Sequence, residues 1–590
     1  MRRTITLLCL ALCLLSLVRE RAAAGGAEFP SGGGRGIGRG SANFARADDP
    51  MVMLRNPALL ADLWSDMAMA GANVLLAGSC FQATGDFGYQ AGMLDVADFG
   101  DGPVFVNPTR GSTDLNGQEL PRIQDEPLPE VCYQGPVPVL PHVGLTMKLM
   151  PDLGVGIGFF PPDNAALSQW GDRDGTVDTP NGRRPSPTRW FRSHLNTSYF
   201  SALGAVGYRM TDWLRVGLGF QWAALAYSTT TWSRSTVTLS LNDDNRTKVF
   251  GRDLFVPGVI ASAQITPFDA LDIAIGFKWS DRVESRAKLD VTTGVFGTGE
   301  VFEYRNAAGE MQRIGSAIPN TTDNIIGRVS APPIWVPQAS LGIRFADRLS
   351  PRVTRDKWNS AHAAAGRSVQ DSMTTERWDI EADAIVYFNS ATDYRKFSTP
   401  AAFVALNRVN GEGVSAASQV RVGACPAGKM QGEVCTAEYE VPANLYGKNQ
   451  LSLRLGGDYN LFPGVFSVRA GVSYETDGQD PRNVDITNYM LGRTGIHVGA
   501  TLRIADKTDI SVGFAHFIQK NVRLLFNTMA VPPDWTMDPG RYHVVQGEND
   551  GTAGFAISDS ADPGDGPNFA NAGEFNYNLS VVTFSIAQHF

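Results

Sequence analysis

Apolar and polar side chains alternate along many short stretches of this chain. In residues 214–222, large apolar side chains occupy every second position, and Arg, Gly or Gln stands between them. Residues 271–279, 466–474 and 496–504 repeat the pattern, and the chain ends on an alternating stretch closed by Phe590. A period of two places the two sets on opposite faces of a β-strand. Long apolar sets facing lipid, with glycines and isolated charges facing a lumen, are typical of a transmembrane β-barrel.

We expect an all-β fold, a transmembrane antiparallel β-barrel of about fourteen strands, which is within the range known for such barrels. The strands are expected to begin near Met67, Val139, Leu153, Thr197, Trp213, Leu254, Leu271, Ile334, Arg377, Leu451, Val465, Thr494, Asp509 and Asn576. The connections after the second, fourth, sixth, tenth and twelfth strands are short, whereas those after odd-numbered strands are long, as in residues 82–136 and 389–449. This asymmetry is typical of outer-membrane barrels with both termini in the periplasm.

One connection departs from this asymmetry. Residues at about 348–375 stand where a short turn is expected, yet they form a long segment whose centre, residues 358–370, favours a helix. We interpret the segment as a periplasmic insertion and assign no function to it.

Residues 1–24 have the features of a secretory signal peptide. Arg2 and Arg3 precede an apolar run at residues 4–18, and residues 22–24 supply three alanines for cleavage. Export together with the barrel pattern predicts localisation in the outer membrane of a Gram-negative bacterium. The lipid of that membrane is an expected partner, and so is the barrel-assembly machinery, which we expect to recognise the C-terminal strand.

Composition narrows the remaining classes of function. The formal net charge is −9, and Lys and Arg form no clusters. An acidic chain without basic clusters is poorly suited to bind nucleic acid. After the leader, no apolar stretch is long enough to cross a bilayer as a helix. We expect the barrel to be a monomer.

Four cysteines remain after the leader: Cys80, Cys132, Cys425 and Cys435. Export into an oxidising compartment favours disulfides, and three pairings are possible. We favour Cys80–Cys132 and Cys425–Cys435, because each pair lies within one expected loop; free thiols are the alternative. A metal site is not expected, since no CxxC motif or cluster of histidines accompanies the cysteines.

Residues 25–65 carry no strand pattern but contain three short motifs. These are Gly36, Gly38 and Arg39; Ala47, Asp48 and Asp49; and Arg55, Asn56, Pro57, Ala58 and Leu59. In order and approximate spacing they resemble the N-terminal plug, or hatch, of the FadL-type family of long-chain fatty-acid transporters of the outer membrane. Some members of that family carry aromatic hydrocarbons.

The resemblance implies that the leader is followed by a plug at residues 25–65 and a barrel at residues 66–590. It also implies passive uptake of hydrophobic molecules, most of all long-chain fatty acids, through an internal pocket and a lateral opening in the wall. Aromatic or other hydrocarbons are the alternative ligands. A barrel of this width leaks unless something fills it. On composition alone, the glycine-rich residues 32–40 also fit a disordered leader.

The third expected strand has features of a lateral opening. An inward face of Gly154, Gly156 and Gly158 leaves the wall without side chains, and Pro161 and Pro162 follow. Proline lacks the N–H group that a sheet ladder requires, so the outer half of this strand should pair poorly. The resemblance also implies a gap at the third strand. The alternative is a strand that simply ends at a Pro-Pro turn.

A fatty acid would also need a partner for its carboxylate. The resemblance implies basic residues in the internal pocket, and the candidates here are Arg234 and Lys396. Neither lies in a motif, and both also fit ordinary loop charges. An uncharged hydrocarbon ligand therefore stays open.

The sequence offers no constellation for catalysis. His142 and His497 are expected on inward faces, but neither has a Ser or an acid at an informative spacing on its strand. No Gly-x-Ser-x-Gly or His-Glu-x-x-His motif occurs. We expect no enzymatic activity, no cofactor and no metal. A general porin or structural barrel is the remaining alternative.

Overall fold

The computed structural model describes residues 32–590 with several gaps. The undescribed segments are residues 84–96, 99–102, 105–110, 120–126, 162–167, 190–193, 234–243, 350–370, 401–402, 411–412, 422–429, 432–433, 436–437, 445–446, 480–489, 520–521, 525–541, 547–552 and 558–572, together with residues 173, 181, 298, 300, 316, 332, 334, 393 and 506. The expected signal peptide and most of the expected insertion at 348–375 lie outside the described residues.

Fourteen antiparallel strands close into one barrel, as expected from the sequence. They are β1 (Met67–Ala83), β5 (Val139–Met150), β6 (Leu153–Phe159), β10 (His194–Arg209), β11 (Leu214–Ser233), β12 (Asn245–Phe268), β13 (Leu271–Ser280), β19 (Gln338–Arg348), β20 (Glu376–Tyr387), β27 (Gln450–Phe462), β28 (Phe466–Glu475), β29 (Arg493–Ile504), β30 (Thr508–Gln519) and β34 (Gly573–His589). The barrel closes where β1 pairs with β34 over its whole length, from Met67 opposite His589 to Ala83 opposite Gly573.

The outer face is apolar, and the alternation seen in the sequence explains it. Leu218, Phe220 and Trp222 on β11 are exposed, whereas the intervening Gln221 is fully buried. The C-terminal strand follows the same rule, and Phe590 is 76% exposed. Among the described residues, no helix has the length and apolar character needed to cross a membrane.

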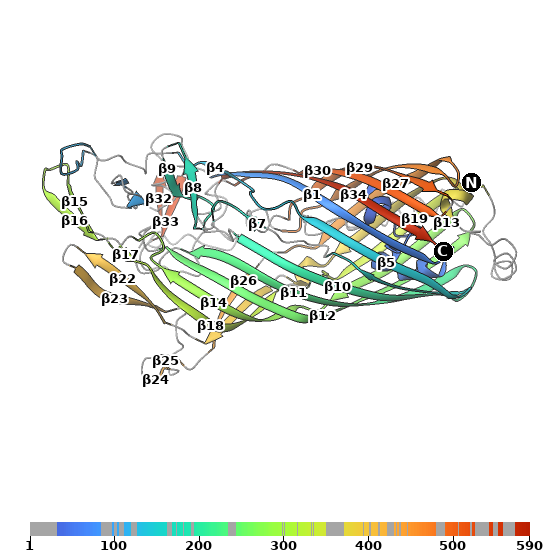
Figure 1. Cartoon of the computed structure of the whole chain (residues 1–590), viewed down its shortest axis with the longest axis horizontal. Helices are drawn as coiled ribbons and strands as arrows, with labels where there is room; N and C mark the ends of the chain where they lie inside the picture. The colour runs from blue at the N-terminus through green and yellow to red at the C-terminus, as the bar shows by residue number, and fades with distance from the viewer. Residues whose placement is uncertain are drawn as a thin grey trace.

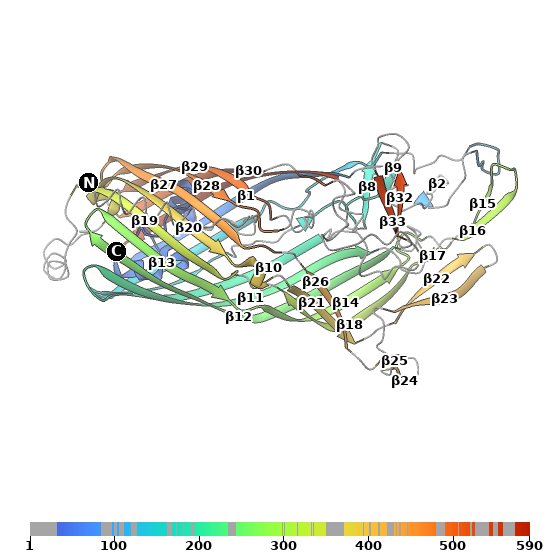
Figure 2. The ribbon, with the colours of Figure 1, turned by 180° about the vertical axis from the view of Figure 1, so that it is seen from behind.

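Short turns and long connections lie at opposite ends of the barrel, and the C-terminus lies at the short-turn end (Figure 1). At the other end the sheet continues beyond the barrel (Figure 2). There β12 pairs with β14 (Val283–Thr293), and β14 pairs with β18 (Asn320–Ala331). This extension explains why β12 begins earlier than expected from the sequence. At the short-turn end, α6 (Ser372–Thr375) is the described helix of the insertion.

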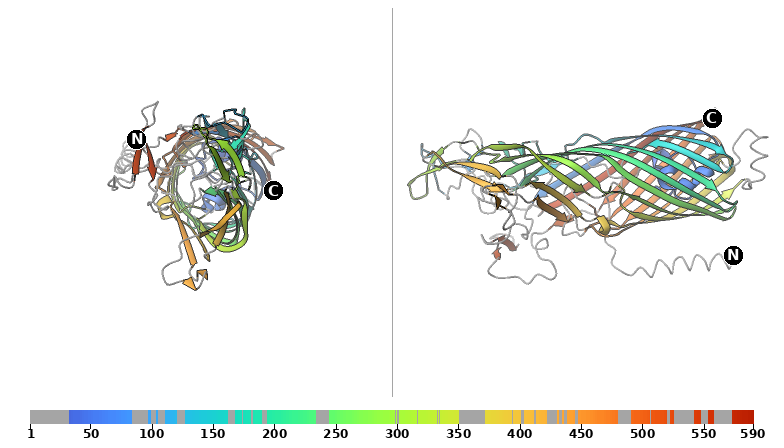
Figure 3. Two further views of the ribbon diagram at one scale, coloured as in Figure 1. Left: turned by 90° about the vertical axis from the view of Figure 1, so that its left-hand side faces the viewer. Right: turned by 90° about the horizontal axis from the view of Figure 1, so that it is seen from below.

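A folded N-terminal segment, residues 32–64, lies inside the barrel (Figure 3). It contains α2 (Gly33–Gly38), α3 (Val52–Arg55) and the 3₁₀-helix η1 (Pro57–Ala61). The glycine-rich stretch thus forms a short helix. Glycine is required where the helix meets the wall, because a Cβ atom on Gly38 would lie 2.9 Å from the Cα of Gly499.

Candidate functional site

The N-terminal segment is held by a buried network of arginines and carboxylates at the short-turn end of the lumen. Its centre is Arg39, whose side chain is fully buried. One guanidinium nitrogen lies 2.8 Å from Asp379 and 2.6 Å from Asp458, and the other lies 3.2 Å from Glu381. These acids come from β20 and β27, so a single arginine of the segment joins two strands of the wall.

Strand β20 supplies an acidic inward face. Asp379, Glu381 and Asp383 stand at every second position and are all buried. Asp383 accepts hydrogen bonds from the backbone N–H groups of residues 43 and 44, at 3.1 and 3.2 Å. Glu381 accepts one from the N–H of residue 45, at 2.5 Å. The face therefore binds the backbone of the segment as well as its arginines.

The Ala-Asp-Asp motif belongs to the same network. Arg46 lies 2.6 Å from Asp48 and 2.8 Å from Asp379. Burial by itself would raise the pKa of Asp48, but the charges of Arg46 and Arg35 hold that pKa well below its usual value. Burial is the main cause that raises the pKa of Asp49 to about 6. The two neighbouring carboxyl groups thus differ because the arginines lie closer to the first.

The third motif contacts another part of the barrel wall, strand β12. Arg55 ends α3. Asn56 donates a hydrogen bond of 2.8 Å to the Phe44 carbonyl, which fixes one turn of the segment. The N–H of Ala58 donates to the Ser262 hydroxyl on β12 at 3.0 Å. Pro57 begins η1, a position that suits its fixed φ angle.

The third barrel strand, β6, is fully paired along its short length. Residues 153–159 pair with β5 on one side and with β10 on the other. Gly154, Gly156 and Gly158 occupy the inward face, as the alternation predicts. The space beside them is filled, since a Cβ atom on Gly154 would lie 2.0 Å from the Leu60 carbonyl oxygen. Gly154 and Gly156 admit the N-terminal segment close to the wall, and Gly158 leaves room for the Phe160 ring.

Beyond Phe159 the wall changes. β10 continues to His194; its pairing with β6 ends at Ala202 opposite Phe159, and its first two residues pair with β7 (Ser168–Gln169). The N–H of Phe160 donates a last hydrogen bond of 3.2 Å to the Ser201 carbonyl. Pro161 is buried; Pro162 lies outside the described residues. In the described part of the chain, no β6 residue pairs with residues 139–142 of β5.

The lumen side of β10, β11 and β12 carries many apolar side chains next to this strand end, with the buried Ser201 and Gln221 among them. Barrel interiors are usually polar. Here inward side chains of these strands, together with Phe160 and Trp335, form one buried cluster with the N-terminal segment. We call the wall part of this cluster the apolar wall; its members are Leu203, Ala223, Leu225, Val256 and Ile260.

Toward the short-turn end the same strands become polar. Arg209 and Arg215 both contact Asp62 of the segment, at 2.9 and 3.0 Å. A polar cavity of about 20 Å³ opens there between Arg46, Asp62 and β19. A space of that size holds about one water molecule, so it does not accommodate a hydrophobic ligand.

Other residues singled out in the sequence are placed less completely. Cys80 on β1 and Cys132 on β4 (Glu130–Cys132) form a disulfide. Cys425 and Arg234 lie outside the described residues. The backbone of Lys396 pairs with Ser330 and Pro442, and its side chain is not described.

Two histidine contacts are not predicted by the sequence. The Nε2 atom of His497 lies 3.0 Å from the Ser473 hydroxyl of the neighbouring strand. His589 connects Ser65, at 3.1 Å, to Asp509, at 2.8 Å. Asp509 also pairs with Arg503 at 2.6 Å and with Arg35, so its charge is already neutralised. The Nδ1 atom of His497 also lies 2.9 Å from the Ile37 carbonyl oxygen, so His497 links the wall to the N-terminal segment, and His589 links it to Ser65, which follows that segment.

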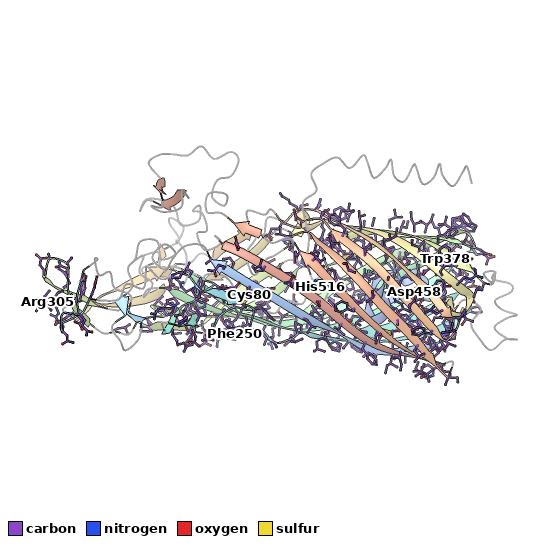
Figure 4. The ribbon with its side chains drawn as sticks, turned by 90° about the horizontal axis from the view of Figure 1, so that it is seen from above. Cys80, Phe250, Arg305, Trp378, Asp458 and His516 are labelled. Carbon is purple, nitrogen blue, oxygen red and sulfur yellow. A yellow bond between two sulfur atoms is a disulfide. The ribbon has the colours of Figure 1, made fainter. Side chains whose placement is uncertain are left out.

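The acidic face of β20 was also missed, although its signal was present in the sequence. Acids at positions 379, 381 and 383 share one face of a strand, which is costly in a lumen unless cations oppose them. Figure 4 shows Asp458 and Trp378 near the short-turn end and Phe250 and Cys80 nearer the loops.

Comparison with solved structures places this architecture. A FadL homologue from Pseudomonas aeruginosa aligns with a TM-score of 0.56 and 14% identity, over 96% of this chain and 100% of that chain. The chain has the FadL-type fold. The toluene transporter TodX from P. putida aligns at 9% identity and a TM-score of 0.48, over 96% of this chain and 99% of that chain.

The CymD monoaromatic hydrocarbon channel gives 11% identity and a TM-score of 0.48, over 95% of this chain and 97% of that chain. No protein-family model and no curated protein sequence matches. The assignment of the FadL-type fold rests on the P. aeruginosa protein.

Proposed function

We propose that this protein is an outer-membrane channel for the passive uptake of hydrophobic molecules, most of all long-chain fatty acids. The observation that carries the proposal is the apolar wall, which lines the lumen beside the outer end of β6. An alkyl chain gains about 0.8 kcal/mol for each CH₂ group that leaves water. A wall of Leu, Val and Ile side chains gives such a ligand a favourable surface where a porin would present polar groups.

A polar substitution in the apolar wall tests this proposal. In Leu203→Asn, the amide stands among buried apolar side chains, where a polar group without a designed partner costs about 1–3 kcal/mol. We expect the rate of fatty-acid uptake by cells to fall about tenfold, which corresponds to about 1.4 kcal/mol. Leu579→Asn is the matched control, because Leu579 is equally buried on the inward face of β34. Equal uptake by the two variants, at equal amounts of folded barrel, would contradict the proposal.

We further propose that the lateral opening lies between β5 and β10, above the Phe159–Ala202 pair and below the pairs that β10 makes with β7. The short ladder of β6, the buried Phe160 and Pro161, and the adjoining apolar wall support this position. A ligand that leaves sideways stays in an apolar environment from the lumen to the acyl chains. It also avoids the charged network around Arg39, which closes the direct route to the periplasm.

Cross-linking the strand end tests the opening. Phe159 and Ala202 stand directly opposite each other, so Phe159→Cys with Ala202→Cys can form a disulfide. We expect uptake to fall about tenfold (roughly 1.4 kcal/mol) under oxidising conditions and to recover after reduction. The pair Leu153→Cys with Tyr208→Cys, at the other end of the same ladder, is the control. Unchanged uptake with a complete Phe159–Ala202 cross-link would contradict an opening that requires β6 and β10 to separate at this end.

Aromatic or other hydrocarbons remain the alternative ligands. The apolar wall suits both classes of ligand. We propose Arg234 and Lys396 as the residues that would bind the carboxylate of a fatty acid. Mass spectrometry of lipids that co-purify with the gently extracted protein distinguishes the two. The buried N-terminal segment supports its role as a plug and argues against a general porin. A large steady conductance in planar bilayers would instead indicate a porin.

A further inference from the structure

The outward face of the loop-side sheet carries a row of three arginines. Arg252 on β12 stands directly opposite Arg286 on β14, and Arg286 stands directly opposite Arg328 on β18. All three residues are exposed. Like charges directly opposite each other on neighbouring strands are destabilising. We call these three residues the arginine row.

The nearby carboxylates have partners other than the arginine row. Glu284 accepts a hydrogen bond from Ser330, and Asp290 lies 3.9 Å from Lys288. Asp253 accepts hydrogen bonds from backbone N–H groups. Within the described residues, no ion pair links an arginine of the row to a carboxylate. Lys288, which is also exposed, adds a fourth cation in the next row.

The position of the arginine row relative to the apolar outer face of the barrel indicates what the row binds. Trp222 and Trp279 are exposed on the outer face, at nearly the same level. Tryptophans of this kind mark the boundary between the acyl chains and the head groups of a membrane. Trp222 pairs with residue 257, five residues below Arg252 on β12. At about 3.3 Å per residue along a tilted strand, the row lies roughly 12–16 Å above the tryptophans.

Apolar side chains surround the row. Leu254 is 61% exposed and lies below it, and Phe250 and Ile326, which are 41% and 63% exposed, flank Lys288 above it. A patch that combines unpaired guanidinium groups with exposed apolar side chains suits a molecule with both phosphates and acyl chains. Arginine binds phosphate through two parallel hydrogen bonds, and several together bind a polyanion.

Resting on the outer-membrane localisation of the proposed function, we propose that the arginine row binds phosphate groups of the outer-leaflet lipid, namely the phosphorylated sugars of lipopolysaccharide. The outer leaflet of this membrane consists largely of that lipid. Its phosphates stand at the level of the row when its acyl chains contact the band below. The bound lipid would offset the mutual repulsion of the three arginines.

The test uses the full-length barrel in mixed micelles that contain lipid A with both phosphates, with binding measured by native mass spectrometry. In the triple variant Arg252→Gln, Arg286→Gln, Arg328→Gln, we expect lipid A binding to weaken about tenfold or more and to lose part of its salt dependence. The charge-matched control is Arg305→Gln, Arg313→Gln, Arg377→Gln, which removes three exposed arginines elsewhere. The control should bind lipid A as the wild type does.

Three outcomes would overturn the proposal. They are equal binding by the triple variant and the wild type, equal weakening in the control, and equal binding of lipid A stripped of its phosphates. Complete displacement by inorganic phosphate would assign the row to free anions instead of lipid. Because no transported molecule enters this test, a wild type that binds lipid A but fails in uptake would contradict the transport proposal alone.

Discussion

Replacing Arg39 with Ala is expected to lower the free energy of unfolding by about 3–5 kcal/mol. The substitution removes the cation that Asp379, Asp458 and Glu381 share in a site closed to water. Buried carboxylates left without a partner charge are the most costly result of breaking such a network. Urea unfolding of the barrel in detergent, followed by tryptophan fluorescence, measures the effect.

Two further variants separate this effect from a general loss of positive charge. Arg377→Ala removes an exposed arginine of β20, the strand that carries Asp379. Its guanidinium group lies 3.8 Å from the Asp347 carboxylate. A change within about 0.5 kcal/mol is expected there, because exposed pairs contribute little. Adding Asp379→Asn to Arg39→Ala should recover part of the loss, since one buried charge then disappears. A wild-type free energy of unfolding in Arg39→Ala would show that the network does not hold the segment.

Replacing Gly456 with Ala is expected to destabilise the protein by about 3 kcal/mol, at the upper end of the usual cost of overpacking. The added Cβ atom would lie 1.9 Å from the Arg39 carbonyl oxygen. Because that neighbour is backbone, the N-terminal segment must shift as a unit and its ion pairs must lengthen. The same urea titration measures the loss, and planar-bilayer conductance reports whether the shifted segment still closes the lumen.

Gly219→Ala is the matched control for this prediction. Gly219 also faces the lumen, but its added Cβ atom would meet its nearest neighbours at 3.4–3.5 Å, which is ordinary contact. A change of less than about 0.5 kcal/mol is expected for it. If Gly456→Ala and Arg39→Ala act on the same contact, their combined effect should be smaller than the sum of the two. Full additivity would mean that the two residues stabilise different parts of the fold.

The plug motif that contains Gly38 and Arg39 is easier to recognise in the sequence than to interpret. Gly38 and Arg39 stand out in the sequence by their resemblance to a plug motif. The partners of Arg39, which are Asp379 and Asp458, lie on strands 340 and 419 residues farther along the chain. Nothing local in the chain relates the arginine to those acids. The acidic face of β20 by itself indicated only that cations were needed.

The inward glycines of β6 also separate what the sequence predicts from what the tertiary contacts decide. Alternation correctly placed Gly154, Gly156 and Gly158 on the inward face, because that depends only on the period of a strand. A bare inward face by itself predicts an opening in the wall. In the structure the Leu60 backbone, the Met53 side chain and the Phe160 ring fill the space beside this face, so the support for an opening comes from the end of the strand at Phe159.

The sequence by itself determined the fourteen strands, their lipid-facing sides and the alternation of short and long connections. Each of these follows from neighbouring residues, since lipid outside and a lumen inside impose a period of two on every strand. Only the tertiary structure decided which side chains meet inside the barrel and which arginines align on its outer face. Those contacts depend on strand register and on closure of β1 against β34, and a slip of one residue would turn every side chain to the other face.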